Sequence, residues 1–523
     1  MALALVLLIL FLVLAISIIS RMLYHDHLPP SPLALPIIGH LHLLGPLIHR
    51  SLHNLSLRFG PLFSLRLGSV PCIVVTSPEL AEEFLKTHEL TFMSRPELTA
   101  IQTLTYNSSF IFKPAGPYWK FMRKLSMTEL FNSHSADKFL SIRDQECMRL
   151  LRLLAKKAQS YEAVDLSEEM RRLCFGIIGQ MIAGKSATTV PAREAWLMVR
   201  EATAIAGEMN FCDFNWVWKK LNLDGYRNKM ESLQRRVDER LEAFIVEREE
   251  LRKKHKKIDG GGSEVGQREV DFLDVLLDLL DAESSEAAEV GFSKLHIKAL
   301  LADFFSAGIE PIAIVLEWAL AELINHPKML EKARKEIDRV IRDGQLVRES
   351  DVPNLPYLQA IIKETFRLHP PLPLLMKICG KQCKIGKYFI PENAFLFVNL
   401  WAIGRDPTNW ENPLEFWPER FLHLDGRDQT STLIDVKGQH YQLIPFGSGR
   451  RICAGMNLTM KIVPRLLAAM IQCFDWKVGG SDCNKMNNNN VLDMNEEPGL
   501  TTRRANNLVC VPVARSNHNI IDP

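Results

Sequence analysis

The chain has 523 residues, of which 47% are hydrophobic and 24% are charged, an ordinary globular balance with enough apolar material for a large core. The formal net charge is only +2, which argues against a nucleic-acid partner. Ten cysteines are scattered along the sequence, and nothing near the closest pair, Cys379 and Cys383, completes a zinc site. This usage favours reduced thiols in a cytosol-facing protein.

The N-terminus predicts a membrane anchor. Residues 2–20 carry no charge and are dominated by aliphatic side chains, and about 20 such residues span a bilayer as a helix. A cleaved signal peptide is the alternative, but no basic residue precedes the run and no small-residue cleavage site ends it. The first charge, Arg21, follows the segment, which favours a cytoplasmic location for the rest of the chain.

A stiff spacer follows the predicted anchor. Prolines at positions 29, 30, 32 and 36 fix the backbone in extended conformations. No long linker rich in Pro, Gly and Ser divides the chain beyond it. We therefore expect an anchor at residues 1–20, a proline-rich hinge at 21–36 and one catalytic unit at 37–523.

The body is predicted to be mainly α-helical with a small β region. Alternating apolar stretches at 62–67 and 72–75 are typical of strands. From about residue 78 to residue 373, apolar residues recur at three- and four-residue spacing, which is the helical period. A highly charged stretch at 240–257 runs into a glycine-rich loop, and residues 508–513 again look like a strand.

Two segments pair residue types suited to polar binding. Trp119 and Arg123 stand at i and i+4, and an indole N–H with a guanidinium suits an anionic carboxylate; the alternative places Trp119 in the core and Arg123 at the surface. Glu364 and Arg367 stand at i and i+3 between apolar neighbours. Such a pair is commonly a weak surface couple, but its neighbours suggest partial burial and a rigid structural node.

The segment 302–312 reads as an apolar helix with an unusual centre. Ala307 and Gly308 are small, Glu310 is acidic and Pro311 follows it. Because proline has no N–H, the carbonyl of Ala307 should lose its helical partner and the helix should kink. Glu310 facing solvent is the alternative to a functional role.

The most informative segment runs from residue 445 to residue 455. It sets Cys453 among glycines, behind the aromatic Phe446 and beside two arginines. Cationic and amide-rich surroundings favour the thiolate that ligates a metal, and glycines let backbone N–H groups approach the sulfur. The alternative is a buried structural cysteine.

The spacing Phe446-x-x-Gly449-x-Arg451-x-Cys453-x-Gly455 resembles the haem-thiolate signature of the cytochrome P-450 monooxygenases. That resemblance implies the cytochrome P-450 fold and a haem b iron held by Cys453. It also implies a scaffold behind the haem made of Glu364, Arg367 and Arg420, the last within Pro418-Glu419-Arg420-Phe421. The haem propionates would be bound by Trp119, Arg123, Arg451 and Lys377.

The resemblance also assigns the segment 302–312 to the distal side of the haem. Ala307 and Gly308 would leave space for dioxygen, and Glu310 would supply the expected acid. Pro311 stands where a threonine hydroxyl normally helps to deliver protons. We hypothesise that a water molecule in the helical gap replaces that hydroxyl, with Glu310 as the proton source.

Several strings resemble plant flavonoid-metabolising members, the group of flavone synthase II, flavanone 2-hydroxylase and isoflavone synthase. They lie at residues 36–44, 66–72, 118–125 and 470–476. The resemblance implies conversion of flavanones to flavones at the endoplasmic reticulum membrane, with O2 and with electrons from NADPH through a separate reductase. The apolar slot for a flat polyphenol would be lined by the loop 99–112, Phe304, Phe305, residues 371–376 and Thr501.

Three alternatives remain open at this stage. The chain could be a hydroxylase of another plant metabolite, forming a 2-hydroxyisoflavanone or acting on a pterocarpan or a triterpenoid. It could be an oxygen-independent haem-thiolate isomerase or dehydratase, which Pro311 would suit. It could also be a haem-binding membrane protein without turnover.

Overall fold

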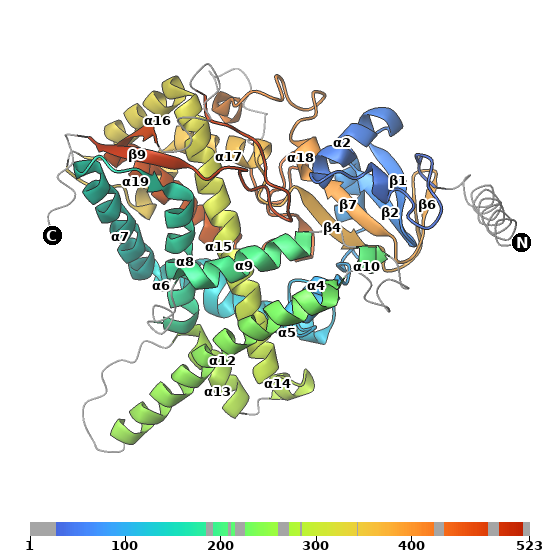
Figure 1. Cartoon of the computed structure of the whole chain (residues 1–523), viewed down its shortest axis with the longest axis horizontal. Coiled ribbons are helices and arrows are strands. Elements are labelled where there is room, and N and C mark those ends of the chain that lie inside the picture. The colour runs from blue at the N-terminus through green and yellow to red at the C-terminus, as the bar shows by residue number, and fades with distance from the viewer. Residues whose placement is uncertain are drawn as a thin grey trace, which may run out of the picture.

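The protein was analysed as a computed structural model, which describes residues 28–184, 192–207, 211–214, 225–259, 271–282, 285–342, 344–422, 434–479 and 491–515. The predicted anchor and residues 21–27 of the hinge lie outside these residues. In Figure 1 most helices gather on one side of the molecule, and the main β-sheet lies on the other. Within the described residues, one helix is long and apolar enough to cross a membrane, but 72% of its apolar window is buried in the fold. That helix is therefore part of the core.

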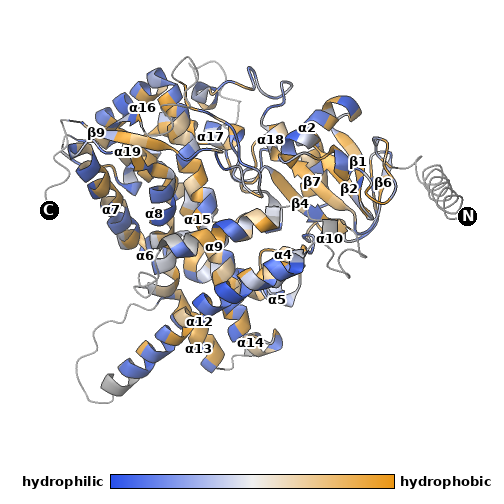
Figure 2. Cartoon of the chain, viewed as in Figure 1, coloured by the Kyte–Doolittle hydropathy of each residue, from blue (hydrophilic) through white to orange (hydrophobic). Residues whose placement is uncertain are grey.

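The main sheet has four strands in the order β1-β2-β7-β4. β1 (Leu62–Leu67) and β2 (Val70–Val75) form an antiparallel hairpin. β7 (Phe395–Asn399) pairs parallel with β2 and antiparallel with β4 (Leu374–Ile378). Every residue of β7 is buried, as expected for a central strand covered on both faces, and Figure 2 shows the apolar character of these strands.

Two smaller sheets complete the β structure. β9 (Val509–Ala514) pairs with both β3 (Val164–Asp165) and β8 (Phe474–Val478), so the C-terminal end of the chain packs beside the helices. β5 (Cys383–Ile385) and β6 (Tyr388–Ile390) form a short hairpin. The strands predicted at 62–67, 72–75 and 508–513 are confirmed, with β2 and β9 differing slightly in their bounds.

The helices account for most of the described chain. They are α2 (Ile48–Phe59), α3 (Pro78–Glu82), α4 (Thr99–Leu104), α5 (Pro117–Ser126), α6 (Ser133–Lys138), α7 (Leu140–Gln159), α8 (Leu166–Ala183), α9 (Ala192–Gly207), α10 (Phe211–Phe214), α12 (Tyr226–Asp259), α13 (Phe272–Asp281), α14 (Ser285–Glu289), α15 (Lys294–Asn325), α16 (Pro327–Val340), α17 (Pro356–Leu368), α18 (Leu400–Ile403) and α19 (Met456–Cys473). Short 3-10 or π turns lie at Leu41–Leu43, Glu83–Thr87, Met127–Phe131, Glu349–Asn354, Pro418–Phe421 and Gly449–Arg451. The expected fold class, mainly α with a small β region, is confirmed.

The helix α15 lies at the centre of the helical part (Figure 1). Nearly all its residues from Ile297 to Leu323 are buried, because its apolar side chains are distributed around the whole helix. It packs in one core cluster with α8, α17 and α19. α15 continues through Pro311 as a single helix. One boundary was wrong: the segment 99–112, expected as a loop, begins with the helix α4.

Candidate functional site

The loop around Cys453 is shaped by glycines with left-handed backbone. Gly447 and Gly449 have φ angles of 73° and 65°, which side chains other than glycine rarely adopt. The loop closes where the amide of Cys453 donates to the carbonyl oxygen of Phe446 at 2.9 Å. The Phe446 ring packs edge-on against Phe366 of α17, with ring centroids 5.2 Å apart. The cysteine is thus presented at a fixed position over the helical core.

The surroundings of the Cys453 thiol combine burial with positive potential. Burial raises its pKa, while hydrogen bonds from the amides of Gly455 and Met456 and the charges of Arg123 and Arg95 lower it. The residue nevertheless keeps accessible surface. The expectation that backbone N–H groups point at the sulfur is confirmed.

Four cations, Arg95, Arg123, Lys377 and Arg451, lie close enough to perturb one another, and two of them, Arg95 and Arg123, also act on this sulfur; the acids whose charges reach the cluster are Asp303 and Glu89. Burial lowers the pKa of Arg451 to about 9, with repulsion from Arg95 and Arg123 as further causes. Burial and the charges of Arg95 and Arg451 lower the pKa of Lys377 to about 7. Among the described residues, no hydrogen-bond partner meets the buried Nε atoms of Arg95 and Arg451. The cluster fits a bound group that carries carboxylates.

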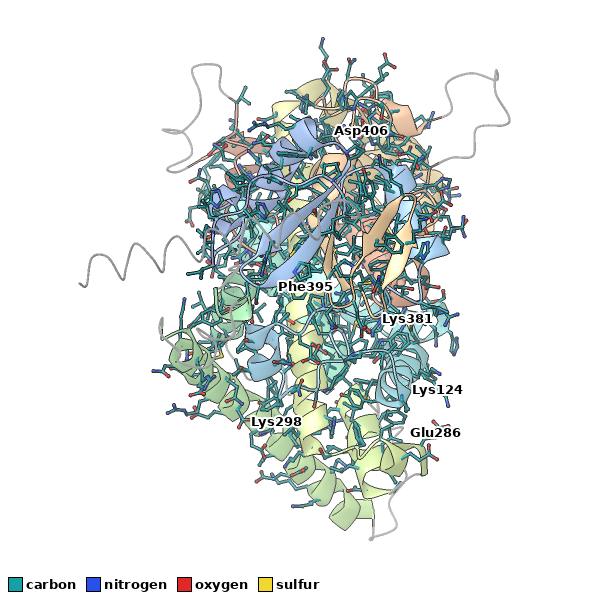
Figure 3. All side chains as sticks on the ribbon, turned by 90° about the vertical axis from the view of Figure 1, so that its right-hand side faces the viewer. Lys124, Glu286, Lys298, Lys381, Phe395 and Asp406 are labelled. Atoms are coloured by element: carbon teal, nitrogen blue, oxygen red, sulfur yellow. The ribbon has the colours of Figure 1, made fainter. Side chains whose placement is uncertain are left out.

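The side chains predicted to bind those carboxylates lie in this cluster. The Arg451 guanidinium stacks over the Trp119 ring at 4.3 Å and donates to the carbonyl oxygen of Lys113 at 2.6 Å. Trp119 is buried on α5, and Arg123 is half-buried one turn further on. α5 is also joined to α14 by the ion pair of Lys124 and Glu286, 3.0 Å apart, which lie side by side in Figure 3.

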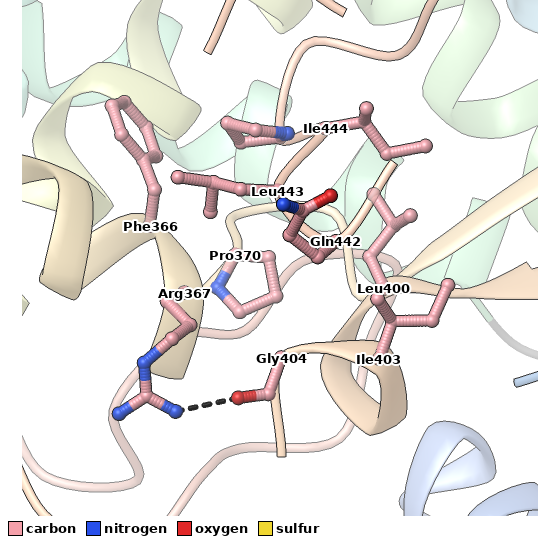
Figure 4. Close-up of a pocket in the computed structure, with 10 residues that line it drawn as sticks. Phe366, Arg367, Pro370, Leu400, Ile403, Gly404, Gln442, Leu443 and Ile444 are labelled. Carbon is pink, nitrogen blue, oxygen red and sulfur yellow. Dashed lines mark hydrogen bonds between the residues drawn. The ribbon is translucent and has the colours of Figure 1, made fainter. Parts of the chain in front are cut away.

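The predicted structural node is present and fully buried. Arg367 donates to both carboxylate oxygens of Glu364 at 2.6 and 2.7 Å, and Arg420 Nε donates to the same carboxylate at 3.2 Å. Arg367 also donates to the carbonyl oxygens of Gly404, Pro413 and Glu415. Figure 4 shows the bond to Gly404 beside a cavity of about 10 Å³, too small for a substrate. The node is structural, as predicted.

The distal helix α15 exposes its small residues unevenly. Ala307 is exposed, and Ser306, Gly308 and Pro311 are half-buried. A Cβ atom on Gly308 would lie 3.2 Å from the Ile178 side chain of α8. This glycine therefore lets α8 pack closely on α15. Gly308 is itself half-buried, and its role in leaving space for dioxygen stays a prediction.

Glu310 does not face solvent. Its side chain is 1% exposed, and its Oε1 atom lies 2.8 Å from Nε of Arg503 in the C-terminal loop. Burial raises the pKa of Glu310, while the charges of Arg503 and Arg171 lower it. The solvent alternative is therefore wrong.

Sequence reasoning missed two residues of the site, Arg95 and Asp303. Arg95 lies close enough to both Cys453 and Asp303 to feel the charge of each. The buried carboxylate of Asp303 on α15 accepts from Ser109 Oγ at 2.7 Å and from the amide of Phe110 at 2.9 Å. No local signal marks Arg95. Asp303 could have been found, since it stands seven residues before Glu310 in an apolar helix.

The predicted substrate slot is supported only in part. Phe305 stacks on Phe175 of α8 and on Phe244 of α12, with centroids 5.6 and 5.9 Å apart. Phe304 packs against three further phenylalanines, at positions 110, 131 and 272. Both rings are buried in the core, and their contact with a substrate stays a prediction. Leu374, Leu375 and Met376 are half-buried at the sheet edge.

The fold and the cysteine site together define a haem-thiolate protein. The family model for cytochrome P450 matches residues 29–503, and the chain belongs to this family. Its fold is similar to that of a zebrafish cytochrome P450 solved with progesterone, with a TM-score of 0.71 and 23% identity over 90% of this chain and 100% of that chain.

More particularly, the chain is similar to plant members of the family. It is 50% identical to cytochrome P450 93B2 of Gerbera hybrida over 94% of this chain and 93% of the relative. It is 45% identical to 2-hydroxyisoflavanone synthase of Glycyrrhiza uralensis, over 95% of this chain and 94% of the relative. The chain is a cytochrome P450 monooxygenase of the plant group to which the flavone and isoflavone synthases belong. The family holds haem through a cysteine thiolate and takes electrons from NADPH through a reductase.

Proposed function

We propose that this monooxygenase acts on flavonoids and converts flavanones to flavones. The observation that carries the proposal is the 45% identity, over nearly the whole chain, to a plant 2-hydroxyisoflavanone synthase. The product of that relative is a hydroxylated C15 flavonoid skeleton, so a flavanone is the substrate class that the similarity supports best. A hydroxylase of another plant metabolite is the second candidate.

The residues around the site support this chemistry. Cys453 would hold the haem iron, with Phe446 beside it, and the haem would supply the oxidation of a C–H bond with O2. Arg123, Arg451, Lys377 and Trp119 would bind the propionates of the haem.

On the distal side, the exposed surface of Ala307 would leave room for dioxygen. Pro311 withholds both a backbone N–H and a side-chain hydroxyl at that face. Glu310 would therefore be the source of protons, passed through a water at the gap in the helical hydrogen bonds. Its raised pKa favours the protonated form that such a donor needs.

The surroundings of the enzyme are part of the proposal. Residues 1–20 would anchor the chain in the endoplasmic reticulum membrane by a single span, with the body in the cytosol. An NADPH-cytochrome P-450 reductase would be its partner. A membrane location would suit a flat and poorly soluble polyphenol substrate.

The test is turnover of naringenin by microsomes that contain the full chain and a plant reductase, with NADPH, followed by mass spectrometry. A product lighter by two hydrogens is expected, and chromatography against standards must identify it as the flavone. An isoflavone would instead place the chain with the isoflavone synthases.

The controls separate the remaining alternatives. Gain of one oxygen would make the enzyme a hydroxylase, and product formed without NADPH or oxygen would make it an isomerase or dehydratase. A Cys453→Ser variant must lose both the product and the carbon monoxide difference band typical of a thiolate ligand. A normal band without any flavonoid product would overturn the flavonoid assignment.

A further inference from the structure

The carboxylate of Glu89 reaches the loop around Cys453 from a distant part of the chain. Glu89 follows the turn Glu83–Thr87, and its Oε1 atom accepts from the backbone amide of Arg450 at 2.6 Å. This bond joins residues that are 361 positions apart. Arg450 lies in the turn Gly449–Arg451, three residues before Cys453. Glu89 therefore fastens the turn that leads into the cysteine.

The bond grips a peptide group that is also held from its other side. The carbonyl oxygen of Gly449 accepts from the amide of Ile452 at 3.1 Å, and the N–H of the same peptide group is the one that donates to Glu89. Because a peptide group is planar and rigid, the two bonds fix its orientation. Ile452 directly precedes Cys453, so this orientation is passed on to the cysteine.

The approach of Glu89 requires glycine at position 449. A Cβ atom on Gly449 would lie 2.3 Å from Oε1 of Glu89, too close for any side chain to stay in place. The φ angle of Gly449, 65°, also belongs to the left-handed region that glycine adopts without strain. The glycine therefore serves both the shape of the loop and the contact with the carboxylate.

The alternative reading of Glu89 is an ordinary surface ion pair with the Arg450 side chain. The guanidinium Nε of Arg450 lies 3.6 Å from Oε2 of Glu89, and the Arg450 side chain is 61% exposed. Such a pair contributes little. The Glu89 side chain itself is only 26% exposed, and its short bond to the amide is charge-assisted. The backbone contact is therefore the stronger of the two.

Glu89 also faces the cations assigned to the propionates. It lines a cavity of about 10 Å³ together with Lys377, Ser448 and Arg451. Burial and the charges of Arg95 and Arg451 lower the pKa of Lys377, and the charge of Glu89 opposes them. Glu89 thus places a negative charge beside the same cations that would hold the haem.

The segment that follows Glu89 is fixed to the main sheet. The amide of Gly380 donates to the carbonyl oxygen of Thr91 at 2.8 Å, and the amide of Ile378 donates to that of Ser94 at 3.0 Å. Ile378 ends β4, the strand that also carries Lys377. Because the sheet holds this segment, Glu89 is a rigid support for the loop around Cys453.

We propose that Glu89 is a positioning residue for the haem thiolate. Its hydrogen bond fixes the peptide group between Gly449 and Arg450, and through it the Cys453 sulfur; its charge lowers the reduction potential of the haem iron. A nearby negative charge favours the oxidised iron, which carries the larger positive charge. The inference rests on haem binding by Cys453 and not on the choice of substrate.

The hydrogen bond is tested on the carbon monoxide complex of the reduced full-length holoenzyme. The loss of its thiolate band is timed at a fixed, mildly denaturing urea concentration. Glu89→Ala is expected to speed this loss about tenfold, as for removal of a hydrogen bond to a charged group. Glu89→Gln is expected to stay close to the parent rate, because its amide oxygen still accepts from Arg450. Glu89→Asp should be as fast as Glu89→Ala, because its shorter side chain does not reach the amide.

The charge is tested by a spectroelectrochemical titration of the iron without substrate. It is run at about pH 6, below the pKa of about 7 of Lys377, so that Lys377 keeps its charge in every variant. Glu89→Gln and Glu89→Ala are expected to raise the midpoint potential, whereas Glu89→Asp should leave it near that of the parent. A merely structural role would not separate the two measurements in this way.

Glu83 supplies the matched control on the same segment. It pairs with His88 at 3.2 Å, and its side chain is 40% exposed. Glu83→Gln and Glu83→Ala remove the same charge and the same carboxylate without touching the loop around Cys453, and should change neither readout. If Glu89→Ala takes up no haem, the Asp and Gln variants decide the question alone.

Two results would overturn the inference. Decay of the thiolate band at the parent rate in Glu89→Asp would remove the positioning role. A potential in Glu89→Gln no higher than in Glu83→Gln would remove the electrostatic role. Neither measurement needs turnover, so both outcomes are independent of whether flavanones are the substrates.

Discussion

The indole N–H of Trp401 donates to the carboxylate of Glu496 at 2.9 Å and so joins α18 to the base of the C-terminal loop. The same carboxylate lies 2.8 Å from the imidazole of His49 and accepts from Arg50 at 2.9 Å, both on α2. Elements that are hundreds of residues apart in the sequence thus meet at one buried acid. Glu496 therefore fixes the loop that carries Arg503.

Acid should destabilise the protein through Glu496. Its pKa is lowered to about 2 against an ordinary value of 4.5, because the pairing with His49 and Arg50 outweighs the opposing effect of burial. Above pH 4.5 the ionised Glu496 contributes about 3 kcal/mol to the unfolding free energy. This contribution is lost as the pH falls from 4.5 toward 2. Thermal unfolding as a function of pH should show a weaker acid dependence in Glu496→Gln. An identical dependence in parent and variant would contradict the assignment.

Replacing Pro311 by threonine should improve the coupling of NADPH use to product. Threonine restores the helical N–H and places a hydroxyl on the face of α15 that also exposes Ala307. Less peroxide per NADPH consumed is the expected result, measured in the reconstituted enzyme. Pro311→Ala is the control, because it restores the N–H without a hydroxyl. Equal coupling in the parent and Pro311→Thr would count against the water-mediated path.

Removing the Glu364 carboxylate should be severely destabilising. Glu364→Ala leaves the Arg367 and Arg420 guanidiniums buried without their anion, and breaking a buried pair in this way costs about 3–5 kcal/mol. The yield of folded holoenzyme and the unfolding temperature should both fall. Glu331→Ala is the matched control. It removes an ion pair with Arg334, 3.3 Å away, in which the Glu331 side chain is 50% exposed. This change should lower the unfolding free energy by about 1 kcal/mol or less. Similar losses of unfolding temperature in the two variants would contradict the structural role of Glu364.

Asp303 should make stability depend on pH near neutrality. Burial raises its pKa to about 7, against the opposing effect of its hydrogen bonds and of Arg95. The folded state then binds a proton that the unfolded state releases above pH 3.8, so this group lowers stability as the pH rises from 3.8 to about 7. Asp303→Asn should flatten the dependence in that window. The amide of Phe110 donates to Asp303. Hydrogen exchange at this amide should therefore report whether the loop around Phe110 stays in place.

The sequence predicted those parts of the site that lie in short continuous motifs. Cys453, with its glycines, and the Glu364–Arg367 pair could be placed because each needs only neighbours within one turn or loop. Asp303 is recognisable as an acid in an apolar helix, but its partners could not be predicted, and neither could Arg95 and Arg503, since the contacts come from distant parts of the chain.

The surroundings of Gly308 and Phe305 could not be predicted for a related reason. Gly308 is small enough to leave space for a ligand, but in the structure it also lets the side chain of Ile178 approach α15. Phe305 suits an aromatic slot as well as it suits the stack with Phe175 and Phe244. Residue type alone does not tell which surface a helix turns toward its neighbours.

Three buried acids, Asp303, Glu310 and Glu317, follow one another at a spacing of seven residues along α15. They therefore lie on one side of the helix and fix its rotation about its own axis. Insertion of one residue between Asp303 and Glu317 would turn everything beyond it by about 100°. At least one carboxylate would then leave its partners and point into the apolar core, whereas the aliphatic side chains that make up most of α15 would tolerate the turn. Ala307 lies four residues after Asp303 and three before Glu310, on the same side of the helix, so these acids also fix the direction in which Ala307 faces.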